Sequence, residues 1–121
     1  MKITTNVEIS DQQIADQIVT ALEGGSNYWV QWAKLTDQNG KQVRKIDLVD
    51  HPELVPTTKL LLMEDEGDEP VEINYDKIKT GLEKMAEVYP NHFSDLINET
   101  GDATTADVFI QMAAFGELVY G

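Results

Sequence analysis

The C-terminal segment, residues 104–121, places the strongest constraint on how this chain folds. Its sequence, TTADVFIQMAAFGELVYG, puts apolar side chains on almost every side of a helix when successive residues are spaced at about 100°. A helix of this kind has to be covered by other elements over most of its circumference. We therefore expect residues 104–121 to form a central, buried helix onto which the rest of the chain packs.

Two polar residues, Asp107 and Gln111, interrupt this apolar segment one helical turn apart. Thr104 and Asp107 have the spacing of a capping box, and a carboxylate in the first turn also suits the helix dipole. Capping is therefore the interpretation we favour for Asp107, with binding of a polar ligand or a neighbouring chain as the alternative. Gln111 has no such role, and a buried amide needs hydrogen-bond partners. The sequence offers Trp29, Trp32, Tyr28 and the backbone near Gly24.

Length and composition favour one domain, residues 1–121, that buries a core without disulfides or a structural metal. The absence of cysteine excludes thiol nucleophiles and Cys-based zinc sites, and it fits a reducing cytoplasm. The N-terminal residues alternate instead of forming an apolar run, and Gln111 and Glu117 break the longest apolar stretch. We expect neither a signal peptide nor a membrane span.

The chain is strongly acidic, with 22 Asp and Glu against 9 Lys and Arg and a formal net charge of −13. Such a charge repels phosphate backbones and anionic membranes and favours basic partners. We therefore expect no direct nucleic-acid binding and no membrane binding. Solubility alone explains the charge equally well. The only cluster of basic residues in the sequence is Lys41, Arg44 and Lys45.

The first half of the chain alternates between strand and helix signals. Residues 3–9 predict a strand, and Ser10 with Gln13 predicts a capping box for a helix that Gly24 and Gly25 end in left-handed geometry. Residues 28–35 and 42–49 predict two strands that pair as a hairpin across the turn at residues 37–40. Residues 50–56 contain two prolines and predict a connection.

The second half predicts a hairpin of residues 59–63 and 71–73, followed by helices. Asn74 can cap one helix that Pro90 closes, and a short amphipathic segment with Phe93, Leu96 and Ile97 follows. This order predicts an α+β fold, with an antiparallel sheet of about four to five short strands and three to four helices gathered on one face.

Residues 23–29 are the first candidate binding segment. They bring together a carboxylate, two glycines and two aromatic side chains, namely Glu23, Gly24, Gly25, Tyr28 and Trp29. Glycines let a ligand approach the backbone, and an aromatic ring can stack on a flat ligand. The structural alternative, which we favour, is a glycine helix end followed by core aromatics. The glycines follow a helix and lack a Lys-Ser/Thr pair, so this is not a phosphate-binding loop.

The loop at residues 64–69 is the second candidate. Together with two neighbouring acidic positions it supplies the carboxylates of Glu64, Asp65, Glu66, Asp68, Glu69, Glu72 and Asp76. Their spacing is not that of an EF-hand, so we expect no metal site and interpret the loop as a solvated hairpin tip. The functional alternative is a mimic of nucleic-acid charge. His51 and His92 have no nucleophile or ligand partner nearby in sequence, and we interpret both as surface or structural residues.

Two motifs resemble a known family. A Glu-Gly-Gly-x-x-Tyr-Trp element at residues 23–29 and a C-terminal Thr-Ala-Asp…Gln…Phe-Gly-Glu…Val-Tyr-Gly element at residues 105–121 are similar to those of short acidic proteins of bacteriophages and prophages. The resemblance implies a phage origin and a host bacterial cytoplasm. It draws attention to motif positions without assigning them roles: Glu23, Gly24, Gly25, Tyr28, Trp29, Asp107, Gln111, Phe115, Gly116, Glu117 and Tyr120.

Our leading functional expectation is a non-enzymatic protein that inhibits a host defence or nucleic-acid-handling protein through its acidic surface. A second hypothesis is a binder of a nucleotide-like small molecule, with Glu23, Tyr28, Trp29, Asp107 and Gln111 around a pocket. A third is that the two motifs build only the core and a homodimer seam. We predict no catalytic residues and no cofactor, because the sequence contains no established catalytic motif.

Overall fold

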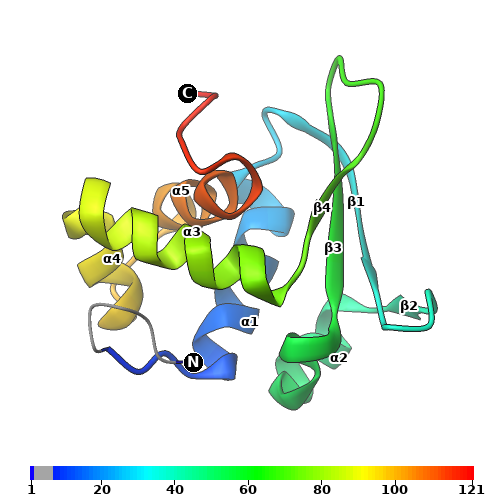
Figure 1. Cartoon of the computed structure of the whole chain (residues 1–121), viewed down its shortest axis with the longest axis horizontal. Coiled ribbons are helices and arrows are strands. Elements are labelled where there is room, and N and C mark those ends of the chain that lie inside the picture. The colour runs from blue at the N-terminus through cyan, green and yellow to red at the C-terminus, as the bar shows by residue number, and fades with distance from the viewer. Residues whose placement is uncertain (2–6) are drawn as a thin grey trace.

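A four-stranded antiparallel sheet stands against a group of helices in the computed structural model, which describes Met1 and residues 7–121 (Figure 1). The order is α1 (Asp11–Thr20), η1 (Ala21–Gly25), β1 (Val30–Thr36), β2 (Gln42–Val43), α2 (Lys45–Asp50), η2 (Pro52–Thr57), β3 (Lys59–Glu64), β4 (Val71–Ile73), α3 (Tyr75–Val88), α4 (Pro90–Ile97) and α5 (Ala103–Phe115). The predicted α+β class is confirmed. The described residues form five α-helices, more than the three to four expected.

The sheet has the strand order β2-β1-β3-β4. Leu35 of β1 lies opposite Leu60 of β3, which in turn lies opposite Ile73 of β4, and all three are buried on the side that faces the helices. Because side chains alternate along a strand, Trp32 and its partner Met63 point to the other side, where Trp32 is 41% exposed. The predicted β3–β4 hairpin is confirmed.

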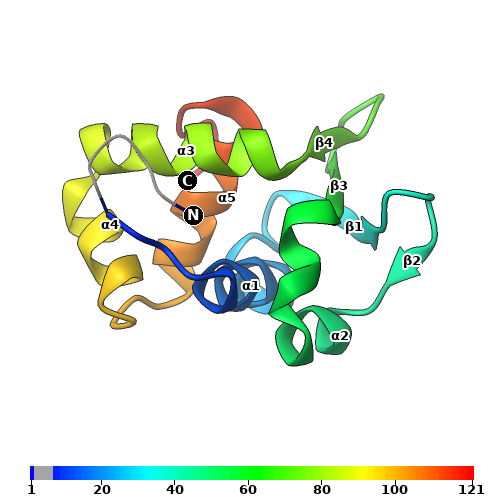
Figure 2. The same ribbon diagram turned by 60° about the horizontal axis from the view of Figure 1, so that its bottom comes forward.

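Helix α5 is the buried centre of the helical layer, as predicted. Every residue from Thr105 to Ala113 is buried, and Figure 2 shows α5 lying between α3 and α1, both of which contact it. The helix nevertheless ends at Phe115, because Gly116 adopts a left-handed conformation (φ 73°) as its C-cap. The prediction that the helix continues to residue 121 was therefore wrong, and residues 117–121 fold back as a tail.

The predicted capping box of Thr104 and Asp107 was also wrong. The N-cap is Asp102, whose carboxylate accepts hydrogen bonds from the backbone N–H groups of Thr104 (3.0 Å) and Thr105 (3.2 Å). The helix consequently begins at Ala103, and Asp107 lies in its second turn, where its side chain turns toward the interior. This frees Asp107 for a different role.

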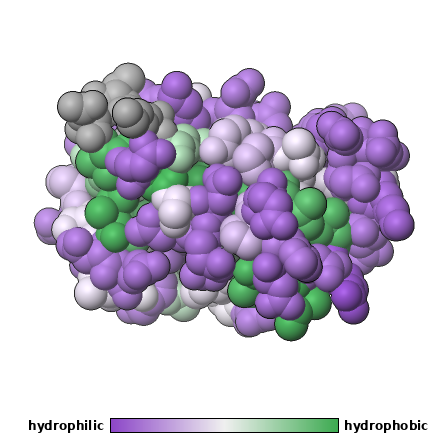
Figure 3. All heavy atoms as spheres, turned by 90° about the horizontal axis from the view of Figure 1, so that it is seen from below, coloured by the Kyte–Doolittle hydropathy of each residue, from purple (hydrophilic) through white to green (hydrophobic). Residues whose placement is uncertain are grey.

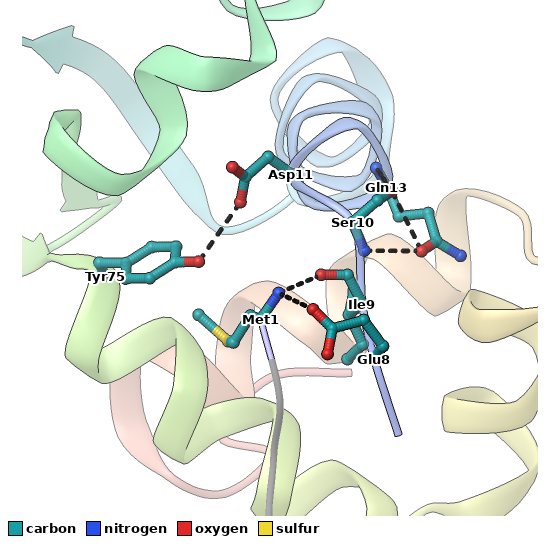
Figure 4. A network of polar contacts seen from close by, with 7 residues as sticks. All are labelled: Met1, Glu8, Ile9, Ser10, Asp11, Gln13 and Tyr75. Carbon is teal, nitrogen blue, oxygen red and sulfur yellow. Dashed lines mark hydrogen bonds and ion pairs between the residues drawn. The ribbon is translucent and has the colours of Figure 1, made fainter. Parts of the chain in front are cut away.

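The predicted capping box at the start of α1 is confirmed and is drawn in Figure 4. Ser10 donates its backbone N–H to Gln13 Oε1 (2.9 Å), and the Gln13 N–H donates to Ser10 Oγ (3.1 Å). Close by, the Met1 amino group donates to the Ile9 carbonyl (2.6 Å), and Tyr75 donates to Asp11 (3.3 Å) between α3 and α1. Much of the strand predicted for residues 3–9 lies outside the described residues.

Gly24 and Gly25 do not have the left-handed geometry predicted for them. Helix α1 widens into the π-helical turn η1, and neither glycine is among those with positive φ. Gly25 is instead required by packing, since a Cβ there would lie 2.4 Å from the carbonyl oxygen of Ala103. The glycine therefore lets η1 approach the start of α5.

The strand predicted for residues 42–49 was wrong beyond Val43. Asp47 accepts hydrogen bonds from the Arg44 backbone N–H (3.3 Å) and from two guanidinium nitrogens, Nε (3.0 Å) and Nη2 (2.9 Å). These bonds close a helical turn and start α2.

The predicted cap of α3 is confirmed. Asn74 accepts a hydrogen bond from the backbone N–H of Lys77 (2.9 Å).

Figure 3 shows one face of the molecule as largely hydrophilic, with apolar residues gathered in small patches between polar ones. Within the described part of the chain, no helix has the length and apolar character needed to cross a membrane. The apolar content is instead concentrated in the interior around α5.

The close packing of α3 on α5 makes a testable prediction at Gly81. A Cβ there would lie 2.6 Å from the backbone N and Cα of Ala113. We expect Gly81→Ala to lower the free energy of unfolding by about 1–3 kcal/mol, although alanine favours helix, because overpacking displaces backbone. Urea denaturation measures this. Gly24→Ala is the control, since its Cβ would meet nothing within 4 Å. Equal stability of the two variants contradicts the prediction.

Candidate functional site

The two sequence motifs meet at the carboxylate of Asp107. Its Oδ1 accepts hydrogen bonds from Ser26 Oγ (2.7 Å) and from the Trp29 indole Nε1 (2.8 Å). Its Oδ2 accepts from the Tyr28 hydroxyl (2.5 Å) and from Gln111 Nε2 (3.0 Å). The network joins the turn after η1 to the second turn of α5.

The turn at residues 26–30 places three donor side chains, those of Ser26, Tyr28 and Trp29, beside Asp107. The Ser26 carbonyl accepts the backbone N–H groups of Trp29 (3.2 Å) and Val30 (3.0 Å), and the Ser26 N–H closes the π-helical turn on Ala21 O (2.9 Å). Ser26 is fully buried. Sequence reasoning missed this residue, and the available signal was a small hydroxyl side chain inside the glycine and aromatic motif.

Gln111 holds the tail through both ends of its amide. Its Oε1 accepts the backbone N–H groups of Val119 (2.8 Å) and Tyr120 (2.9 Å), and its Nε2 donates to the Tyr120 carbonyl (3.3 Å). The Tyr28 hydroxyl, one of the partners expected for Gln111, is confirmed at 3.2 Å. The Trp29 indole binds Asp107 instead, and the tail backbone was not foreseen.

Aromatic rings complete the closure of this core. Tyr120 stacks on Trp29 with ring centroids 4.9 Å apart and planes inclined by 8°, and Phe115 lies 5.5 Å from Trp29. Trp29 is 1% exposed and Gln111 is fully buried. Trp29 and Gln111 are therefore closed off from solvent by the tail.

The acidic hairpin is attached to the same core. The Tyr120 hydroxyl donates a short hydrogen bond to Glu64 Oε1, and the backbone N–H of Asp65 donates to the Trp29 carbonyl (3.0 Å). The two candidate regions identified from sequence therefore form one continuous region. Nothing in the sequence indicated this connection.

Both tyrosines of the network are held in the protonated form. Burial, and then the hydrogen bond to Asp107, raises the pKa of Tyr28 to about 12. The hydrogen bond to Glu64, and then burial, raises the pKa of Tyr120 to about 12. Each hydroxyl, already a donor at neutral pH, therefore remains one to higher pH than an ordinary tyrosine. Among the described residues, no cationic side chain pairs with Asp107, so neutral donors alone solvate this carboxylate.

The other residues of the motifs lie around the core. The Glu23 carboxylate is directed toward Lys45 of α2, with Oε1 3.9 Å from Nζ, and Glu117 is exposed on the tail. A side chain at Gly24 would meet nothing within 4 Å. The partner of the Glu23 carboxylate is therefore Lys45.

The acidic loop between β3 and β4 projects beyond the body of the sheet at the top of Figure 1. Asp65, Glu66, Asp68 and Glu69 are exposed, and within the described residues none of them forms an ion pair. Glu72 pairs with Lys59 (3.2 Å), and Asp76 is exposed in the first turn of α3. The described side chains contain no group of three His, Cys, Asp or Glu that could hold a metal ion.

Two cavities lie near these residues. The larger, about 420 Å³, lies beside β1, β2 and the start of α2 and is lined in part by Gln31, Ala33, Val43 and Lys45. The smaller, about 270 Å³, lies between the aromatic core and the acidic loop. Its walls are Tyr28, Trp29, Asp65, Glu66 and Tyr120.

No protein-family model matches this sequence, and comparison with curated proteins and with solved structures finds no match. The function therefore has to be argued from the charges, cavities and exposed groups around the Asp107 network.

The Asp107 network predicts that the charge of this side chain stabilises the fold. Asn has the same shape but only one acceptor oxygen, so Asp107→Asn leaves buried donors without partners. We expect a loss of about 3 kcal/mol in the free energy of unfolding, measured by urea denaturation. The matched control is Asp102→Asn on the same helix, which should change stability by less than about 0.5 kcal/mol because Asn is an equally good N-cap. Equal losses would argue against the network.

The raised pKa values of Tyr28 and Tyr120 predict that the protein loses stability at high pH. The unfolded pKa of tyrosine is about 10, and the folded values of Tyr28 and Tyr120 are about 12. A raised folded pKa gives stability that is complete below the unfolded value and is lost as the pH rises to the folded value. We expect the free energy of unfolding to fall between about pH 10 and 12.

Tyr28→Phe should reduce the slope of that fall and leave the contribution of Tyr120. Urea titrations at fixed pH values measure it. Parallel curves for wild type and Tyr28→Phe would show that Tyr28 does not contribute.

Proposed function

We propose that this protein acts by binding, and that the acidic loop at residues 64–69 engages a basic surface of a partner protein. The observation that carries the proposal is a projecting loop whose exposed carboxylates have no cationic partner within the described chain. Carboxylates that serve only the fold are commonly paired or spread over the surface. A concentrated, unpaired set attracts a positively charged partner.

The position of the loop is fixed at its base, which favours specific binding. Glu64 accepts from Tyr120, the Asp65 N–H donates to the Trp29 carbonyl, and the Gly67 N–H donates to Glu64 O (2.9 Å). These bonds restrain the charged loop before a partner arrives. Restraint reduces the conformational entropy that is lost on association and so raises affinity.

We further propose that the partner normally binds nucleic acid and that the loop imitates phosphate charge. The net charge of −13 supports this because it disfavours direct contact with a phosphate backbone and favours proteins that bind one. The resemblance to short acidic phage proteins supports a bacterial host protein as the target, with the host cytoplasm as the site of action. Host defence proteins and nucleic-acid-handling enzymes both present such surfaces.

The alternative of a nucleotide-like ligand is less well supported by the geometry. Stacking on Trp29 and hydrogen bonding to the Gln111 amide are what such a ligand requires, and Tyr120 occupies both. A ligand would have to displace the tail from the core.

The test compares a variant that lacks four loop charges with a control variant that lacks four exposed charges elsewhere. The loop variant carries Asp65→Asn, Glu66→Gln, Asp68→Asn and Glu69→Gln. The control carries Asp50→Asn, Glu53→Gln, Glu87→Gln and Glu99→Asn, all at exposed positions. At Glu99 asparagine suits the positive φ of 58°. Each protein is immobilised and used to capture binding proteins from bacterial lysate at increasing salt concentration.

We expect the wild type and the control to retain the same partner at low salt and to release it as salt rises, because screening weakens contacts between exposed charges. The loop variant should retain at most about a tenth as much, and duplex DNA should displace the partner from the wild type. Retention that is insensitive to salt, or equal losses in both variants, would reject the proposal.

A further inference from the structure

The smaller cavity, beside the acidic loop, has walls of two kinds. Tyr28, Trp29 and Tyr120 supply aromatic rings, and Asp65 and Glu66 supply carboxylates. Tyr28 is 53% exposed and Trp29 is 1% exposed, so the cavity runs from the surface to the edge of the core. Its volume of about 270 Å³ is below the roughly 300–1,000 Å³ of sites for drug-sized ligands.

The polar atoms of these rings are already engaged. The Tyr28 hydroxyl donates to Asp107, the Tyr120 hydroxyl donates to Glu64, and the Trp29 indole N–H donates to Asp107. An entering group therefore meets a lining of aromatic and acidic residues that offers no free ring donor, with Tyr28 the most exposed of the three aromatic residues. This lining repels anions, and a neutral apolar group would desolvate the two carboxylates without compensation.

A cationic side chain is attracted both by aromatic rings and by carboxylates. Ring faces attract ammonium and guanidinium groups through their quadrupoles, and a carboxylate adds Coulomb attraction and hydrogen bonding. The methylene stem of lysine or arginine can lie against the rings while its charged head reaches Asp65 and Glu66. Both tyrosines are neutral at physiological pH, as phenols ordinarily are, and the raised pKa values of about 12 extend this to higher pH.

We propose that this cavity takes a single lysine or arginine side chain of the protein partner and is the specific anchor within the broader acidic surface. The proposal rests on the proposed function and deepens it by naming the group that is bound. The other loop carboxylates, Asp68 and Glu69, do not line the cavity, and their attraction for the partner is unspecific.

The first experiment uses Nα-acetyl-lysine amide and Nα-acetyl-arginine amide as probes, with the neutral Nα-acetyl-citrulline amide for comparison. Trp32→Phe leaves Trp29 as the sole tryptophan, since the chain contains two. We expect the cationic amides to change Trp29 fluorescence saturably in the millimolar range and the citrulline amide to leave it unchanged. Equal responses to all three amides, or no response to any, would overturn the proposal.

The second experiment compares two variants with equal charge loss on the same loop. Asp65→Asn with Glu66→Gln alters the cavity wall, and Asp68→Asn with Glu69→Gln leaves it intact. We expect the first pair to weaken binding of the cationic amides about threefold to tenfold, and the second pair to change it less than about twofold. Equal weakening by both pairs would overturn the cavity as the binding site.

The same two variants separate this proposal from the proposed function. In the lysate capture, loss of the partner with both pairs to the same degree leaves the charge-driven function standing and rejects the cavity as its anchor. Retention of the partner by both pairs, and by the variant lacking all four charges, rejects the function itself. A larger loss with the cavity pair supports both proposals.

Discussion

The carboxylate of Asp107 is the interaction on which the rest of this structure depends. A buried charge without a cation destabilises a fold by several kcal/mol unless hydrogen bonds replace its hydration. Ser26, Tyr28, Trp29 and Gln111 provide those bonds to its two oxygens. Because the donors come from both sequence motifs, satisfying this one group fixes the turn after η1 against α5. Gln111 extends the constraint to the tail.

The elements that could be predicted from sequence are those whose cause is local. Ser10 and Gln13 are three residues apart, and Asn74 caps a helix that begins at the next residue, so each signal lies within one turn of its effect. The burial of α5 follows from its own apolar residues. The β3–β4 hairpin follows from two apolar runs around a polar loop. These features were sufficient to give the α+β class and the central helix.

The features that could not be predicted depend on residues distant in sequence. Ser26 and Asp107 are separated by 81 positions, and the contact of Tyr120 with Glu64 spans 56. Asp107 was assigned to capping because Thr104 has the correct spacing, whereas Asp102, a better cap, was available two residues before Thr104. The requirement for glycine at position 25 comes from the close approach of Ala103, which no local pattern encodes. The motifs indicated which segments meet but not that the acidic loop joins them.

The attachment of the acidic loop to Trp29 and Tyr120 also helps to explain why its carboxylates are concentrated at this position. Carboxylates placed side by side repel one another, and this lowers the stability of the hairpin that carries them. Solubility alone requires only net charge, which spread positions provide equally well without that repulsion. Here the charges are concentrated, and the base of the loop is attached to the aromatic core through Trp29 and Tyr120. The arrangement offsets repulsion with anchoring and holds the carboxylates beside the half-exposed ring of Tyr28, as the proposed recognition of a cationic side chain requires.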